Sequence, residues 1–214
     1  MRRDQKRIYL MTDKMLNVEP FFTRSDGAYV FARWGRPIVP VVFGVDAPTL
    51  SVFKAAIEAV VVAANHKMDE LDTELGANLM MFFCKDWAEL LDVPHLDQMI
   101  PEIGPLIAKL QASDANQYRL FRFDAQGAIS ACFVFLRMDA HLAEASADTL
   151  ALSQAAQMIL LWSDTAPSLL GEINGMTVLR PEIAGVIRAA YDPVMPSVAH
   201  DPNHALRLSA RISL

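Results

Sequence analysis

The organisation of this 214-residue chain is decided by residues Asp139–Asp164, DAHLAEASADTLALSQAAQMILLWSD. The pattern predicts one long helix, or a loop that leads into a helix. The second half of the segment is apolar almost all the way round, and a helix of that kind belongs in the middle of a domain. Three polar side chains interrupt the apolar run, and these are Ser153, Gln154 and Gln157.

The polar trio occupies the place where a zinc peptidase would carry H-E-x-x-H on a helix. Here the chain reads Ser153-Gln154-Ala155-Ala156-Gln157. A hydroxyl and two neutral amides are poor zinc ligands beside imidazole and thiolate, and an amide cannot act as a general base. We therefore expect the trio to be packed and hydrogen-bonded and to bind no zinc, and we predict no cofactor.

Composition and charge narrow the class of protein. The chain is 53% hydrophobic and 21% charged, and its formal net charge of -6 argues against a nucleic-acid partner held through phosphates. No apolar run approaches the ~20 residues of a membrane span, and the run Ile8–Met11 is shorter than the roughly 7–15 residues of a signal-peptide core. The chain as written is therefore predicted to be cytoplasmic, or periplasmic if an export signal has been removed.

Five apolar runs predict a mixed sheet of four to five strands packed against several helices. Ala77–Cys84 is unbroken and predicts an interior strand. Residues 28–34 and 38–44 predict two strands joined by a short turn, and Pro40, which lacks an N–H, places the second of them near an edge. A second pair of runs flanks the turn at 124–127, whose Gly127 favours a hairpin.

Two further helices are marked by their ends. Asp46 is a good N-cap for a helix with Pro48 in its first turn. A second helix begins at Pro181 and ends at Tyr191-Asp192-Pro193, because a proline disfavours helical geometry in the residue before it. We expect Tyr191 to be a structural lock rather than part of a site. The whole chain is predicted to be one α+β domain at 28–193, with an N-terminal arm at 1–27 and a C-terminal tail at 194–214.

Other reactive side chains form no familiar motif. The chain has no G-x-S-x-G, no glycine-rich phosphate loop and no C-x-x-C. His200 and His204 are four residues apart, but Pro202 lies between them, so we expect two incidental histidines in an exposed tail. Cys84 and Cys132 lie in apolar strand-like runs and are expected to be buried free thiols, with a disulfide between neighbouring strands as the alternative.

The order of these features resembles an uncharacterised bacterial family of unknown function, usually exported, whose fold is similar to the zincin-type metallopeptidases. The matching features are the Arg33-Trp34…Pro37 strand pair, the helix after Asp46, the Ala77-Asn78 strand, the Asp124…Gly127 hairpin and the closing Ala190-Tyr191-Asp192-Pro193. The resemblance covers about residues 28–193. It implies a zincin-like fold.

The chain also departs from the pattern of that family. Ser153 and Gln154 replace acidic residues of the family's helix, Gln157 matches, and Asp164 is what remains of a Gly-Leu-x-Asn-Asp segment that follows the helix. Together the resemblance and these losses imply a zincin-like domain whose metal site has decayed.

The resulting expectation is a non-catalytic binding or scaffold module with a protein or small-molecule partner. Its candidate pocket is formed by Ser153, Gln154, Gln157, Asp164 and His141. The alternative is a hydrolase, metal-dependent or peptidase-like, whose site is assembled from residues such as Asp139, His141 and Asp164.

Overall fold

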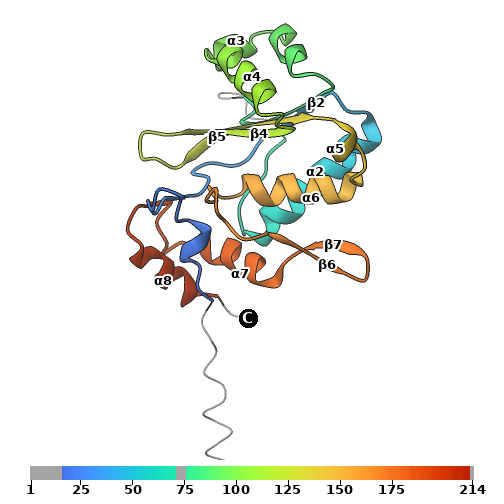
Figure 1. Ribbon diagram of the computed structural model, residues 1–214. Helices are drawn as coiled ribbons and strands as arrows, with labels where there is room; N and C mark the ends of the chain where they lie inside the picture. The colour runs from blue at the N-terminus through green and yellow to red at the C-terminus, as the bar shows by residue number, and fades with distance from the viewer. Residues whose placement is uncertain (1–15, 71–75, 213–214) are drawn as a thin grey trace, which may run out of the picture.

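The computed structural model describes residues 16–70 and 76–212 (Figure 1). Its elements, in chain order, are η1 (Glu19–Phe21), β1 (Phe31–Ala32), β2 (Pro40–Phe43), α2 (Ala47–Ala63), β3 (Leu79–Cys84), η2 (Trp87–Asp92), α3 (Leu96–Met99), α4 (Ile103–Ala112), β4 (Gln117–Phe123), β5 (Ile129–Arg137), α5 (Ala140–Ala143), α6 (Ala147–Met158), β6 (Leu170–Ile173), β7 (Met176–Leu179), α7 (Pro181–Ala190), β8 (Val198–Ala199) and α8 (Asn203–Ser209).

A four-stranded mixed sheet in the order β2-β3-β5-β4 forms the centre of this α+β fold. β2, β3 and β5 are parallel, and β4 runs antiparallel to β5 through the hairpin turn that ends at Gly127. The predicted places of two strands are confirmed, since β3 lies inside the sheet and β2 at its edge. Pro40 is tolerated there because only one side of an edge strand needs ladder donors.

Helices cover both faces of this sheet. In Figure 1, α3 and α4 lie above it, while α2 and α6 lie below it and are followed by α7 and α8. β3 is apolar throughout because it contributes to two cores: Leu79 and Met81 join the larger one, and Phe82 and Cys84 the smaller one under α4. A strand with alternating apolar and polar residues would leave one of these cores incomplete.

The expected strand pair at 28–44 is wrong. β1 pairs antiparallel with β8, and β2 pairs with β3. The chain crosses between the two sheets at Trp34, which is fully buried and donates its Nε1–H to the carbonyl oxygen of Met158 at 2.8 Å. This anchor at the end of α6 holds the segment too deep in the core for a local hairpin.

The prediction of a single helix at 139–164 is also wrong, and the alternative of a loop that leads into a helix is closer to the structure. Asp139 caps the short α5 by accepting from the Leu142 N–H at 2.8 Å, and Ser146 caps α6 by accepting from the Thr149 N–H at 3.2 Å. Two successive caps start two helices. α6 ends at Met158, and the chain beyond it becomes extended, with a β-bridge between Leu160 and Arg33.

Both terminal segments contribute to the larger core. Phe22, from the expected arm, and Leu208, from the expected tail, are fully buried in it. The expectation of an exposed His204 is wrong: only 4% of it is exposed, and its Nδ1 lies 2.8 Å from the Tyr29 hydroxyl oxygen. His200 is exposed, as expected. Residues 170–179 form the β6–β7 hairpin.

The two cysteines are buried and free, as predicted. Burial raises the pKa of the Cys84 thiol to about 11 and that of the Cys132 thiol to about 12. In the described part of the chain, no helix is both long and apolar enough to cross a membrane.

Candidate functional site

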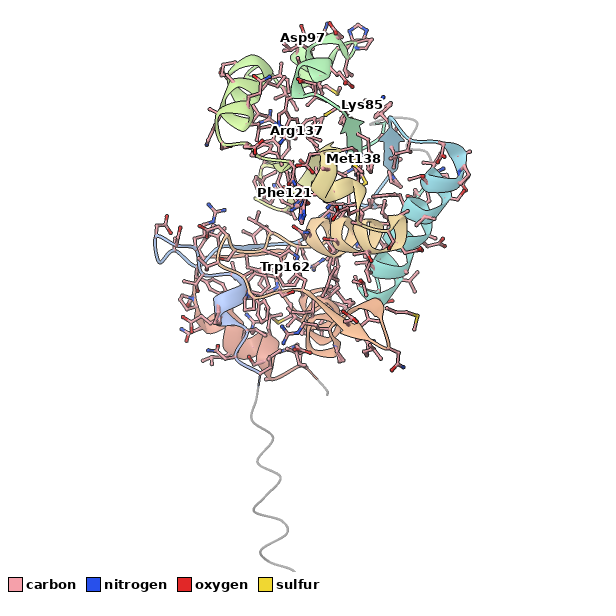
Figure 2. All side chains as sticks on the ribbon, turned by 45° about the vertical axis from the view of Figure 1, so that its right-hand side comes forward. Lys85, Asp97, Phe121, Arg137, Met138 and Trp162 are labelled. Carbon is pink, nitrogen blue, oxygen red and sulfur yellow. The ribbon has the colours of Figure 1, made fainter. Side chains whose placement is uncertain are left out.

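A cavity of about 840 Å³ lies between the edge strand β4, helix α6 and two loops. β4 contributes Arg119 and Phe121, and α6 contributes Ser153 and Gln157. The remaining walls come from residues 24–26, which follow η1, and residues 161–170, which follow α6. Figure 2 labels Phe121 on the sheet side of this site and Trp162 on the loop side. The volume falls within the range of about 300–1,000 Å³ that is typical of small-molecule sites.

Arg119 is placed in the cavity by the alternation of β4. Tyr118 and Leu120 pack on the smaller core, so Arg119 and Phe121 point to the opposite face, where α6 lies. The guanidinium donates from Nη1 to the Gln154 side-chain oxygen at 2.5 Å, and from Nη2 to the Gln157 side-chain oxygen. The two glutamines of the polar trio therefore hold a cation, and that cation belongs to the chain itself.

The two glutamines have fixed amide orientations. A guanidinium can only donate, so each glutamine must turn its oxygen towards Arg119 and its nitrogen away. The Gln154 amide nitrogen donates to the Gln117 side-chain oxygen at 2.9 Å, and the Gln157 amide nitrogen donates to the Ser153 hydroxyl oxygen at 2.8 Å. Gln154 is fully buried behind the cavity, which makes this network part of the core.

Arg119 has no anionic partner within the described residues. No Asp or Glu there forms an ion pair with it, and burial lowers the pKa of its guanidinium below the usual value. The group stays charged, because arginine is not deprotonated in proteins. Its two hydrogen bonds are made to neutral amides, so one half-buried positive charge is left uncompensated at the cavity.

The floor of the cavity, defined as Arg119, Ser153 and Gln157, offers donors to a ligand. Two of the five guanidinium N–H groups are used by the glutamines, which leaves three. The Ser153 oxygen already accepts from Gln157, and its hydroxyl hydrogen has no acceptor among the described residues. The second amide hydrogen of Gln157 likewise has no acceptor there. A ligand group that suits this floor carries acceptors and negative charge.

The rim of the cavity, defined as Arg24, Ser25, Asp26 and Asp164, is exposed. Asp164 joins its two loops by accepting from the Ser25 hydroxyl at 2.5 Å and from the Ser25 backbone N–H at 3.0 Å. These hydrogen bonds lower the pKa of the Asp164 carboxyl. Asp164 is therefore a carboxylate near neutral pH, and it positions residues 24–26 over the cavity.

The structure brings together most of the side chains of the candidate pocket. Ser153, Gln157 and Asp164 line the cavity, and Gln154 lies directly behind Arg119. His141 is exposed on α5 and does not line the cavity. Asp139 caps α5 and accepts from Asn116, away from the cavity lining. Among the described residues, no three His, Cys, Asp or Glu side chains are arranged to hold a metal ion.

Sequence reasoning missed Arg119. The run Tyr118–Phe123 alternates apolar with basic residues, which predicts a strand with its basic side chains in solvent. The usable signal was the pairing of that alternation with a polar trio on an otherwise apolar helix, since buried amides need charged or polar partners.

Comparison with protein-family models, curated proteins and solved structures finds no match for this chain.

Proposed function

We propose that this protein is a non-catalytic binding module that holds an anionic small molecule in the cavity above Arg119. The observation that supports the proposal is the floor itself: a half-buried guanidinium held by two glutamine oxygens, with no carboxylate paired to it in the described chain. The remaining groups of the floor are donors. A bound carboxylate or phosphate would supply both the acceptors and the missing charge.

The energetics favour this role over a purely structural one. Removing a charge from water is costly unless the charge is paired, and proteins usually pair a buried arginine with a carboxylate. Two neutral amides satisfy two N–H groups but neutralise no charge. A site prepared in this way keeps its arginine fixed by the surrounding hydrogen bonds, so that little side-chain freedom is lost when a ligand binds.

The proposal includes two expectations from the sequence, namely that the fold is zincin-like and that its metal site has decayed. A binding role agrees with a helix that carries Ser153, Gln154 and Gln157 instead of metal ligands. The hydrolase alternative stays a prediction, and the positions of Asp139 and His141 outside the cavity lining do not favour it.

Calorimetric titration with hexanoate and with inorganic phosphate, at constant ionic strength, tests the proposal. We expect the wild-type protein to bind at least one of the two anions, and Arg119→Gln to weaken that binding at least tenfold. The matched control is Arg122→Gln on the same strand, because Arg122 is exposed and does not line the cavity. Arg119→Lys keeps the charge without the planar fork, and should bind with intermediate affinity.

The proposal fails if wild-type protein binds neither anion at millimolar concentration. It also fails if Arg119→Gln, shown by circular dichroism to be folded, binds them as tightly as Arg122→Gln does.

A further inference from the structure

We infer that the ligand of this cavity is a zwitterion, with a carboxylate on the floor, a protonated amine at the rim and an apolar body between them. The inference rests on the proposed function and adds the chemical class of the ligand. It is carried by the distribution of charge between the floor and the rim of one cavity.

The charge of the floor selects a singly charged anion. Arg119 supplies one positive charge, while Ser153 and Gln157 supply neutral donors. A carboxylate balances that charge one for one and accepts several hydrogen bonds. A phosphate monoester carries about -1.5 to -2 at neutral pH, so it would leave surplus negative charge in a half-buried site.

The rim carries the opposite sign. Its charged side chains are Arg24, Asp26 and Asp164, which give one positive and two negative charges among the cavity-lining residues. Neither carboxylate forms an ion pair with Arg24 or Arg119 in the described chain. Asp164 accepts from Ser25, and one oxygen of Asp26 accepts from the Ala28 N–H at 2.9 Å. Both keep lone pairs for a ligand, since each ionised carboxylate has about four acceptor positions.

A second negative group on a ligand would therefore meet repulsion at the rim, whereas an ammonium group would be attracted there. The cavity is also lined by apolar side chains, namely Phe121, Leu161, Trp162, Leu169 and Leu170. These walls suit an aliphatic or aromatic body. An ω-amino acid and a short peptide share this chemistry, and a cavity of about 840 Å³ has room for either.

Three six-carbon compounds separate the contributions of the two ends: 6-aminohexanoate has both charges, hexanoate only the carboxylate, and hexylamine only the amine. We expect calorimetric titration of the wild-type protein to give at least tenfold tighter binding for 6-aminohexanoate than for hexanoate. Hexylamine should show no binding that depends on Arg119. Dileucine, titrated in parallel with 6-aminohexanoate, distinguishes a short peptide from an ω-amino acid by which of the two binds more tightly.

The double variant Asp26→Asn/Asp164→Asn should bring the affinities for 6-aminohexanoate and hexanoate close together. Asparagine keeps a side-chain oxygen for the backbone N–H groups of Ala28 and Ser25, so the loop contacts can persist. The control with the same change in net charge is Asp92→Asn/Asp97→Asn, in η2 and α3 beyond the opposite face of the sheet, where Figure 2 labels Asp97. This control should keep the tenfold preference.

Equal binding of hexanoate and 6-aminohexanoate by wild-type protein, lost in Arg119→Gln, would overturn the zwitterion and leave the anion-binding proposal intact. The same holds if the double rim variant retains the full preference for 6-aminohexanoate. If no probe, phosphate included, binds in an Arg119-dependent way, both proposals are overturned.

Discussion

Replacing Tyr191 by phenylalanine removes one oxygen atom from the point where three segments of the core meet. The Tyr191 hydroxyl donates to the carbonyl oxygen of Ile159 at 2.8 Å and accepts from the backbone N–H of Trp34 at 3.3 Å. Tyr191 ends α7, Ile159 follows α6, and Trp34 lies between β1 and β2. All three residues are buried, and burial raises the pKa of the Tyr191 phenol. The hydroxyl therefore stays protonated and able to donate.

The size of the effect follows from the two groups that Tyr191→Phe leaves behind. Without the hydroxyl, the Trp34 N–H and the Ile159 carbonyl face only each other across the β-bridge between Arg33 and Leu160, and no well-formed hydrogen bond joins them in the described chain. An unsatisfied buried polar group costs about 1–3 kcal/mol, so we expect the free energy of unfolding to fall by about 2–4 kcal/mol. For a chain of this length, such a loss lowers Tm by roughly 5–15 °C. Tyr191→Ala should cost more, about 3–5 kcal/mol, because it also leaves a cavity.

Guanidinium unfolding followed by tryptophan fluorescence measures the change. The matched control is Tyr118→Phe, since Tyr118 is a half-buried tyrosine whose hydroxyl makes no hydrogen bond in the described structure. The control should be as stable as wild type. If Tyr191→Phe is equally stable, the argument that this hydroxyl joins three segments is refuted, and a loss of hexanoate binding in that stable variant would make Tyr191 part of a site.

Three further predictions concern other buried groups. The pKa of His204 is lowered to about 4, chiefly by burial and also by Arg207. Between pH 6.5 and pH 4 the unfolded chain therefore binds a proton at this histidine, and the folded chain does not. The free energy of unfolding should therefore fall by up to about 3 kcal/mol between pH 6.5 and pH 4, and this slope should be absent in His204→Gln but present in the exposed control His200→Gln. Asn78→Ala should destabilise the protein by about 2–4 kcal/mol in urea unfolding, because the Asn78 side chain accepts from the Val39 N–H and donates to the Pro37 carbonyl; Asn203→Ala, at an exposed position, is its control. Cys84 and Cys132 should react with a thiol reagent at the rate of unfolding, and fast labelling of either thiol in native protein would contradict their burial.

Local signals in the sequence were sufficient to predict the interior strand of the sheet and several helix ends. The unbroken apolar run of β3 indicates a strand covered on both faces, and Asp46 caps α2 by accepting from Thr49 as its position predicts. The pairing of β1 with β8 could not be predicted in this way. Phe31 and Ala199 are brought together from nearly opposite ends of the chain, whereas the apolar runs at 28–34 and 38–44 are adjacent in sequence and therefore suggested a hairpin.

Arg119 shows more specifically why the site was only half predicted. Period-two alternation assigns the residues of a strand to two faces, but it does not tell which face is exposed. α4 precedes β4 and α6 follows β5, and they cover opposite faces of the sheet, so Arg119 turns towards α6 and not into open solvent. The helix pattern revealed the polar trio, and the strand pattern revealed a basic side chain. Their contact depends on the packing of α6 across the sheet, which neither pattern contains.

This contact also gives a physical reason to expect that the trio binds no zinc. The side-chain oxygens of Gln154 and Gln157 are the strongest donors that the trio could offer a metal, and both already accept from Arg119. A divalent cation placed among them would meet a fixed positive charge at short range in a half-buried site, where such repulsion is poorly screened. The same charge attracts an anion, so the turn of helix that would hold a metal ion in a zinc peptidase is suited here to a negatively charged ligand. Elemental analysis after dialysis against zinc should find no zinc that is lost in Ser153→Ala/Gln157→Ala, and one equivalent lost in that variant would contradict this account of the site.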